Sequence, residues 1–210
     1  MIGIVDYGMG NLRSVMMGFG RVGAGARIVT TPQQVAASDK LVLPGVGAFA
    51  DAIAHLRDRG LDRPIVEAIE AGRPFLGICL GLQLLFEVGY EDGEHRGLGV
   101  LAGEVVRFDF TGLPERGRLP IPHMGWNQIE YDGAIPLLEG VPSASYMYFV
   151  HSYHVVPRTD GLALVKTDYG RPFVSAVARD NLLATQFHPE KSQAVGLRIL
   201  ENFAGLGTGG

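Results

Sequence analysis

The only cysteine of the chain has a spacing of neighbours that could make it a nucleophile. Cys79 has one glycine two positions before it and another two positions after it, Gly77 and Gly81. The apolar run Phe75–Ile78 predicts a strand, and the residues after the cysteine predict a helix over Leu80–Val88. In such a nucleophile elbow the glycines remove side chains that would clash in a strained turn. A buried, inert cysteine is the alternative.

The predicted turn also places groups that could assist the sulfur. The free N–H groups and the dipole at a helix N-terminus favour a thiolate. The N–H of Leu80, the next residue, is expected to point to where an oxyanion could form. Gln83 lies about one helical turn further along, on the same side. The spacing therefore suggests acyl-transfer chemistry, without naming a substrate.

A cysteine nucleophile needs a base, and His188 is the best placed of six histidines. It follows the apolar run Leu183–Phe187, a predicted strand whose end would line the ligand crevice of a parallel sheet. Glu190 lies two residues further, so its carboxylate can point to the same side and orient the imidazole. A structural histidine at a strand end is the alternative. Of the other histidines, His55 and His95 are expected in solvent, and no base is assigned to His123, His151 or His154.

A glycine-containing loop follows another predicted strand. The stretch Pro44–Gly47 reads P-G-V-G. The G-x-G within it is a weak signal for phosphate binding, and no G-K-[ST] follows. A loop after this strand could instead supply the second oxyanion donor. An ordinary β-turn is the alternative.

Alternating strands and helices would position these residues. The first half of the chain alternates apolar runs with amphipathic stretches, which predicts a parallel sheet covered by helices on both faces. Its strands are expected at Ile2–Val5, Ala26–Val29, Leu41–Leu43 and Phe75–Ile78, and its helices at Asn11–Val22, from Pro32, at Ala50–Leu56, Pro64–Ala71 and Leu80–Val88. The second half predicts strands, some antiparallel, and a closing helix: Val105–Phe108, Asn127–Glu130, Tyr146–His151, Ala163–Lys166, Phe173–Ala178, Leu183–Phe187 and the helix Gln193–Phe203. The predicted fold is a single α/β domain over residues 1–204, with a central mixed, mostly parallel sheet, helices on both faces and a disordered tail over 205–210.

The composition excludes several classes of protein. The chain has 210 residues, a formal net charge of −4 and one cysteine. The charge argues against a nucleic-acid platform, and one cysteine excludes a disulfide framework and a cysteine-based zinc site. The longest apolar stretch, Phe75–Phe86, is shorter than the roughly 20 residues of a membrane span, and the N-terminus lacks a basic signal region. We expect a cytoplasmic protein that needs no metal, cofactor, nucleic acid or membrane.

Three motifs together resemble the class I glutamine amidotransferases. They are P-G-V-G at Pro44–Gly47, G-I-C-L-G-L-Q at Gly77–Gln83 and T-Q-F-H-P-E-K-S at Thr185–Ser192. Further stretches resemble one branch, the glutaminase subunits of imidazole glycerol phosphate synthase in histidine biosynthesis: Asp6–Asn11, Pro44–Phe49, Pro122–Asn127 and Tyr148–Tyr153. Two alternatives stay open. One is another class I glutaminase, of vitamin B6 synthesis or of the tryptophan branch, and the other is a non-catalytic binding subunit.

The resemblance implies a glutaminase with a Cys-His-Glu triad. Cys79 would attack the side-chain amide of glutamine, forming a γ-glutamyl thioester and releasing ammonia, while His188 transfers the proton and Glu190 orients His188. The ammonia would pass to a separate (β/α)₈-barrel cyclase subunit in a heterodimer. The resemblance also assigns supporting residues: an oxyanion hole at Val46, Gly47 and Leu80, glutamine binding at Gln83, Ser152 and Tyr153, and a partner interface at Asn11, Trp126, Tyr148 and Lys191.

Overall fold

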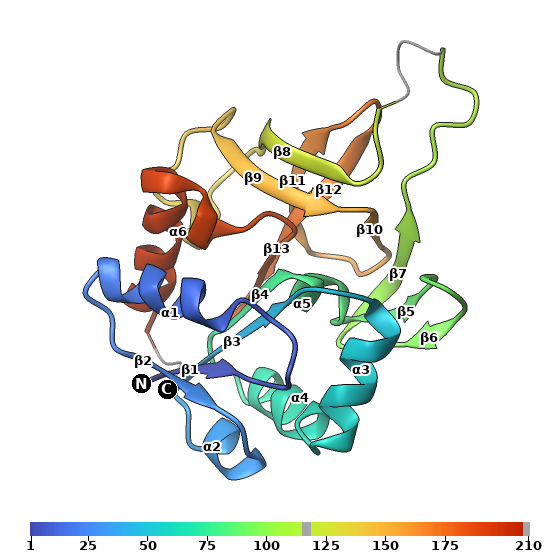
Figure 1. Cartoon of the computed structure of the whole chain (residues 1–210). Coiled ribbons are helices and arrows are strands. Elements are labelled where there is room, and N and C mark those ends of the chain that lie inside the picture. The colour runs from blue at the N-terminus through green and yellow to red at the C-terminus, as the bar shows by residue number, and fades with distance from the viewer. Residues whose placement is uncertain (115–118, 208–210) are drawn as a thin grey trace.

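A computed structural model describes residues 1–114 and 119–207 of the chain. Within these residues, eleven strands form one mixed sheet and two more form a small sheet beside it (Figure 1). The large sheet has the order β2-β1-β3-β4-β13-β12-β10-β7-β5-β6, with β11 also paired to β12. The small sheet pairs β8 with β9.

The element bounds are as follows. The strands are β1 Ile2–Val5, β2 Ala26–Val29, β3 Lys40–Gly45, β4 Phe75–Cys79, β5 Phe86–Gly89, β6 His95–Arg96, β7 Leu101–Arg107, β8 His123–Gln128, β9 Tyr146–His151, β10 Tyr153–Pro157, β11 Ala163–Asp168, β12 Pro172–Arg179 and β13 Leu182–Thr185. The helices are α1 Leu12–Arg21, α2 Pro32–Ala36, α3 Phe49–Asp58, α4 Asp62–Glu70, α5 Leu80–Gln83 and α6 Gln193–Gly205, with short 3₁₀ helices η2 Pro136–Leu138 and η3 Pro189–Lys191.

The predicted fold class is confirmed. Strands β2, β1, β3, β4 and β13 are mutually parallel neighbours, and β1, β3, β4 and β13 are buried along their whole length. Burial on both faces is why these strands appear in the sequence as unbroken apolar runs. From β13 onward the sheet continues through antiparallel pairings with β12, β10 and β7. The carboxyl ends of β3, β4 and β13 therefore meet at one edge of the sheet.

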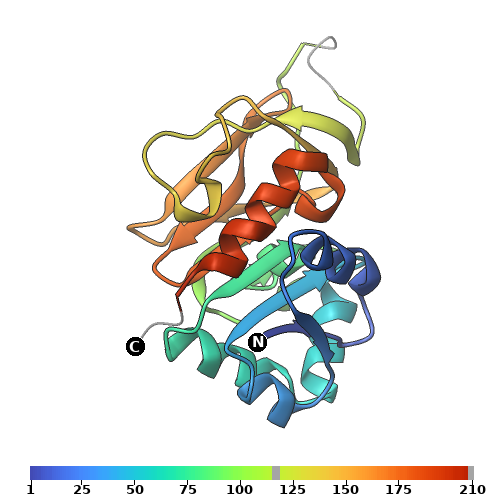
Figure 2. The ribbon, with the colours of Figure 1, turned by 90° about the vertical axis from the view of Figure 1, so that its left-hand side faces the viewer.

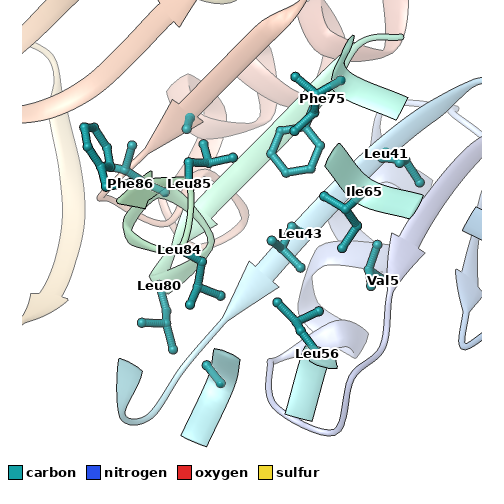
Figure 3. Packing of buried hydrophobic residues seen from close by; sticks show 14 of the residues in the cluster. Val5, Leu41, Leu43, Leu56, Ile65, Phe75, Leu80, Leu84, Leu85 and Phe86 are labelled. Atoms are coloured by element: carbon teal, nitrogen blue, oxygen red, sulfur yellow. The ribbon is translucent and has the colours of Figure 1, made fainter. Parts of the chain in front are cut away.

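Helices cover both faces of the sheet. Residues of α1 and α6 pack on one face, where the rings of Phe19 and Phe203 lie 6.1 Å apart, and Figure 2 shows these two helices side by side. Residues of α2, α3 and α4 pack on the other face. Because side chains alternate along a strand, Leu41 and Leu43 of β3 belong to this second cluster. Figure 3 shows both leucines in this cluster, together with Leu56 of α3 and Ile65 of α4. The strands of the sheet thus lie between two apolar clusters, one on each face.

The helix predicted over Leu80–Val88 is wrong in length. It ends at Gln83, and the chain enters β5 at Phe86, which pairs with β7. The carbonyl groups of Leu84 and Leu85 accept hydrogen bonds from the N–H groups of Leu98 and Leu101. These distant partners satisfy the backbone in place of the next helical turn. A local apolar pattern carries no information about such a pairing.

Other boundaries also differ from the predictions. The strand expected at Asn127–Glu130 is β8, which ends at Gln128, and the strand expected at Leu183–Phe187 is β13, which ends at Thr185. Strands β5, β6 and β10 were not predicted. Only Ser152 separates β10 from β9, so no turn signal marks the boundary. The domain limits stay predictions: α6 extends through Gly205, and residues 208–210 of the predicted tail lie outside the described residues.

Across residues 1–114 and 119–207, every helix is too short or too polar to cross a membrane. The same residues contain no group of three or more histidine, cysteine, aspartate or glutamate side chains that could hold a metal ion.

Candidate active site

Cys79 lies in a strained turn at the end of β4. Its φ is 56°, in the left-handed region that side chains rarely occupy. A Cβ added at Gly81 would lie 1.9 Å from the carbonyl oxygen of Leu43, and one at Gly77 would lie 2.8 Å from the Gly81 oxygen. Both glycines are therefore required because backbone approaches backbone. Since α5 has a single turn, its dipole gives the sulfur less support than the longer predicted helix would have given.

His188 and Glu190 form a buried pair. His188 Nδ1 lies 2.7 Å from Glu190 Oε1, and the two side chains are 3% and 1% exposed. His188 precedes η3, and its backbone N–H donates to the carbonyl oxygen of Tyr148. Its Nε2 is buried and has no hydrogen-bond partner within the described residues. The pair thus presents one free ring nitrogen, with the other fixed by the carboxylate.

The environment of His188 favours the imidazolium. Burial lowers its pKa, but contact with the Cys79 sulfur and with the Glu190 carboxylate outweighs burial and raises the pKa of His188 to about 10. The ring is therefore positively charged at neutral pH. A cationic imidazole beside a sulfur favours the thiolate form of the sulfur. This arrangement suits a nucleophilic cysteine better than an inert one.

A cavity of about 300 Å³ opens above the sulfur. It is lined by Cys79 and His188 of the predicted triad, by every residue expected to form the oxyanion hole or bind glutamine, and by four residues not expected there. The complete lining is Val46, Gly47, Cys79, Leu80, Gln83, Glu91, Pro122, Val150, His151, Ser152, Tyr153 and His188. The sequence motifs from opposite halves of the chain therefore converge on one pocket.

Glu91 is a pocket residue that the sequence analysis did not identify. One of its carboxylate oxygens accepts a hydrogen bond from the backbone N–H of Phe49 at 2.7 Å, which fixes the side chain at the start of α3. Glu91 lies in an acidic loop between β5 and β6, and no motif marks it. The side chain brings a carboxylate to the pocket wall.

Gln186 is a second residue that was missed. Its side chain is fully buried, and its Nε2 lies 3.6 Å from the Cys79 sulfur. Its Oε1 accepts from Gln83 Nε2, which also donates to the carbonyl oxygen of Tyr153. The one available signal was its position two residues before His188, where side chains alternate toward the same side. The predicted strand end placed it inside the sheet instead.

The predicted partner residues form one surface cluster, apart from Asn11. Trp126 of β8 and Tyr148 of β9 are directly paired, with ring centroids 5.9 Å apart, and Lys191 Nζ lies 5.7 Å from the centroid of the Tyr148 ring. Trp126 is 46% exposed, so it is not a core residue. Asn11 caps α1, its side chain accepting from the N–H of Ser14.

The remaining histidines differ in their surroundings. His55 is exposed on α3 as expected, whereas the expectation for His95 is wrong, because it is half-buried in β6 with its Nε2 enclosed. The ring of His154 on β10 lies 5.0 Å from the ring of Phe108, with the two ring planes tilted by 36°. His123 and His151 are buried and hydrogen-bonded to each other at 3.0 Å.

Acid should destabilise the fold through the two buried histidines. Burial lowers the pKa of His123 to about 4 and that of His151 to about 3, whereas unfolded histidines take up a proton near pH 6.5. The unfolded state therefore binds more protons, and the free energy of unfolding should fall between pH 6.5 and 5, approaching ~1.4 kcal/mol per pH unit for each histidine. Urea unfolding of the native chain and of His123→Phe checks this. The free energy of unfolding should depend less steeply on pH in the variant than in the native chain, and equal slopes would contradict the prediction.

The family follows from comparison with known proteins. A family model described as "Glutamine amidotransferase class-I" matches residues 3–205. The chain belongs to this family. Its relatives named "Imidazole glycerol phosphate synthase subunit HisH" include one from Syntrophotalea carbinolica, 56% identical and covering 98% of this chain and 100% of the relative. Another, from Aquifex aeolicus, is 52% identical and covers 95% of this chain and 94% of the relative. The predicted branch of the family is thus confirmed over the alternative class I branches.

Solved structures support the fold. A crystal structure titled as a glutamine amidotransferase matches with a TM-score of 0.72 at 22% identity, covering 98% of this chain and 99% of that one. The structure of PurLQS from Thermotoga maritima matches with a TM-score of 0.72 at 17% identity, covering 96% of each chain. At these identities the likeness concerns the arrangement of strands and helices alone.

Proposed function

We propose that the chain is the glutaminase subunit of an imidazole glycerol phosphate synthase, and that Cys79, His188 and Glu190 are its triad. It hydrolyses glutamine to glutamate and ammonia and supplies the ammonia to a cyclase partner. The observation that carries the proposal is the convergence on one cavity of Cys79, the His188 ring that Glu190 holds from behind, and the oxyanion loop. A cysteine beside an imidazolium is equipped to attack an amide carbon.

The first half of the reaction breaks the amide bond. The Cys79 thiolate attacks the side-chain carbonyl carbon of glutamine, and the oxyanion is stabilised by N–H groups of Leu80 and of Val46 or Gly47. Leu80 is the first residue of α5, so its N–H has no partner inside the helix. The His188 imidazolium donates its proton to the departing nitrogen, which leaves as ammonia. The product is a γ-glutamyl thioester on Cys79 and a neutral imidazole.

The second half hydrolyses the thioester. Neutral His188 removes a proton from water, the hydroxide attacks the thioester carbon, and glutamate leaves as the Cys79 thiolate and the imidazolium are restored. Glu190 holds the ring in orientation and stabilises its positive charge throughout. In the pocket, the Glu91 carboxylate complements the α-ammonium group of glutamine, and the Ser152–Tyr153 backbone and Gln83 hold its other polar groups.

The small sheet carries the surface that fits a partner. Met124, Trp126 and Tyr146 expose 63%, 46% and 57% of their surface on β8 and β9. Exposed apolar groups that gather in this way mark interaction sites. We assign this surface to the cyclase, a (β/α)₈-barrel subunit in the family's pattern. A partner bound at this surface would contact β9. The same strand also lines the glutamine pocket, through Val150 and His151.

A glutamine-analogue diazo ketone tests the proposal. The analogue should add covalently to Cys79 of the full chain, detected as one mass adduct, because the chain has a single cysteine. Excess glutamine should protect Cys79 and should itself be hydrolysed, and the hydrolysis rate should rise when the cyclase and its ligand are added. Absence of both labelling and hydrolysis, with the cyclase present, would support the alternative of a non-catalytic binding subunit.

A further inference from the structure

A continuous chain of hydrogen bonds joins β8 to the Cys79 sulfur, exposed at its β8 end and buried at the sulfur, and the proposed triad does not use it. Asn127 Nδ2 donates to the carbonyl oxygen of Asp168 at 2.8 Å and lies 3.3 Å from His123 Nε2. His123 Nδ1 lies 3.0 Å from His151 Nε2, and His151 Nδ1 lies 2.8 Å from the carbonyl oxygen of Tyr153.

The same Tyr153 oxygen accepts from Gln83 Nε2 at 3.1 Å, and Gln83 Nε2 also donates to Gln186 Oε1 at 3.0 Å. Gln186 Nε2 then lies 3.6 Å from the Cys79 sulfur. This series of hydrogen bonds therefore ends on the sulfur of Cys79, the atom proposed to attack glutamine.

The backbone carbonyl of Tyr153 determines the direction of the histidine half of the chain. A carbonyl oxygen only accepts, so His151 must carry its proton on Nδ1. His151 and His123 are both neutral at pH 7, because burial lowers their pKa values well below neutrality. The His151 Nε2 is then an acceptor, His123 donates to it through Nδ1, and the His123 Nε2 accepts from Asn127. One arrangement of protons satisfies all of these contacts.

The same carbonyl determines the direction of the glutamine half. Gln83 must turn its NH₂ group toward the Tyr153 oxygen, and its second hydrogen reaches the Gln186 oxygen. Gln186 therefore cannot exchange the positions of its oxygen and nitrogen without losing this bond. Its NH₂ group is held toward the sulfur in a fully buried position, where an N–H bond to an anion is strong.

We propose that Gln186 is a catalytic hydrogen-bond donor to the Cys79 thiolate, and that Gln83 and His151 are positioning residues that hold its amide in the donating orientation. The proposal rests on Cys79 being the nucleophile. Gln186 and His188 then both stabilise the Cys79 thiolate, in different ways. His188 supplies a positive charge and the proton that moves during the reaction, whereas Gln186 supplies a fixed amide dipole that does not change.

Other titratable groups also surround the sulfur, and their effects on it must be distinguished from that of Gln186. Tyr7, which follows β1, has a buried hydroxyl whose pKa is raised by burial and by the nearby Cys79. His188 precedes η3, His151 ends β9, and Glu91 faces the pocket from the loop after β5. A substitution at Gln186 leaves all four in place, so a change in thiol titration reports the lost donor.

Alkylation of the full-length chain by iodoacetamide between pH 5 and 10 tests the proposal. Iodoacetamide reacts with the thiolate, and the single cysteine makes the mass adduct unambiguous. Gln186→Met keeps an unbranched side chain and removes the donor. Its alkylation midpoint should rise by about one pH unit, which is about a tenfold slower reaction below the midpoint. The loss of glutaminase activity should appear in kcat more than in KM.

Two further variants separate positioning from general damage. His151→Phe retains a ring of similar size and removes the donor to Tyr153, so its midpoint should rise in the same direction by a smaller amount. Gln128→Met, an exposed position on β8 outside the hydrogen-bond chain, should match the native profile. Circular dichroism and thermal melting check folding in each case.

The outcomes are distinct. A Gln186→Met profile that superimposes on the native one would overturn the role of Gln186, and an unchanged His151→Phe profile would overturn the positioning role of His151. Alkylation needs no glutamine, so a native chain that alkylates readily but neither hydrolyses glutamine nor reacts with the diazo ketone would reject the proposed function instead.

Discussion

Cys79→Ala is expected to remove glutamine hydrolysis by about four orders of magnitude or more, because no covalent intermediate can form without the sulfur. The buried pair His188 and Glu190 would remain, but the sulfur beside His188 would be missing from the cavity. The complex of this variant with the cyclase should still form product when ammonia is supplied in place of glutamine. The measurement is a paired assay of synthesis with glutamine and with an ammonium salt.

The paired assay separates loss of chemistry from loss of assembly. If Cys79→Ala also lost synthesis from ammonia, the substitution would have disturbed the partner and not the nucleophile alone. Glutamine-dependent synthesis at near the native rate would exclude Cys79 as the nucleophile. Since the Cys79 side chain is buried at the end of β4, thermal melting of the variant completes the comparison.

The first half of the fold could be predicted because the sequence pattern of each strand and helix there reflects how that element is buried. Strands β1, β3 and β4 are buried on both faces and therefore appear as apolar runs, each followed by a helical stretch. Strand β5 could not be predicted, because its sequence continues the apolar pattern of α5 and only its pairing with β7 makes it extended. A long-range pairing has no local signature.

The residues of the candidate site likewise fall into those set by local geometry and those set by long-range contacts. The glycines around Cys79 and the His188–Glu190 spacing reflect local geometry, so the sequence could place them. Gln186 lies beside the Cys79 sulfur at a strand end, and Glu91 lines the pocket from a loop. The exact positions of the two residues depend on contacts with β12 and α3. The buried partnership of His123 and His151 crosses the small sheet, and no spacing in the sequence shows that the two rings face each other.

Gly81→Ala is expected to disrupt the active-site turn and to destabilise the fold by at least about 3 kcal/mol, at the upper end of overpacking effects. The added Cβ would lie 1.9 Å from the carbonyl oxygen of Leu43, so α5 must move away from β3. That movement shifts Leu80 and the Cys79 sulfur relative to His188. Urea unfolding should show the loss of stability, and glutaminase activity should fall below a hundredth of the native rate, because even ~1 Å of misplacement costs about a hundredfold.

Gly20→Ala is the matched control for this prediction. Gly20 lies in α1, and a Cβ there would meet no atom within 4 Å. The same chemical change should therefore leave activity unaltered and stabilise the chain by up to about 1 kcal/mol, through helix propensity. The contrast between the two alanines isolates steric contact from the general effect of replacing glycine. A Gly81→Ala chain as stable and active as Gly20→Ala would show that the turn tolerates a side chain, and the close approach of α5 to β3 would then not be what positions Cys79.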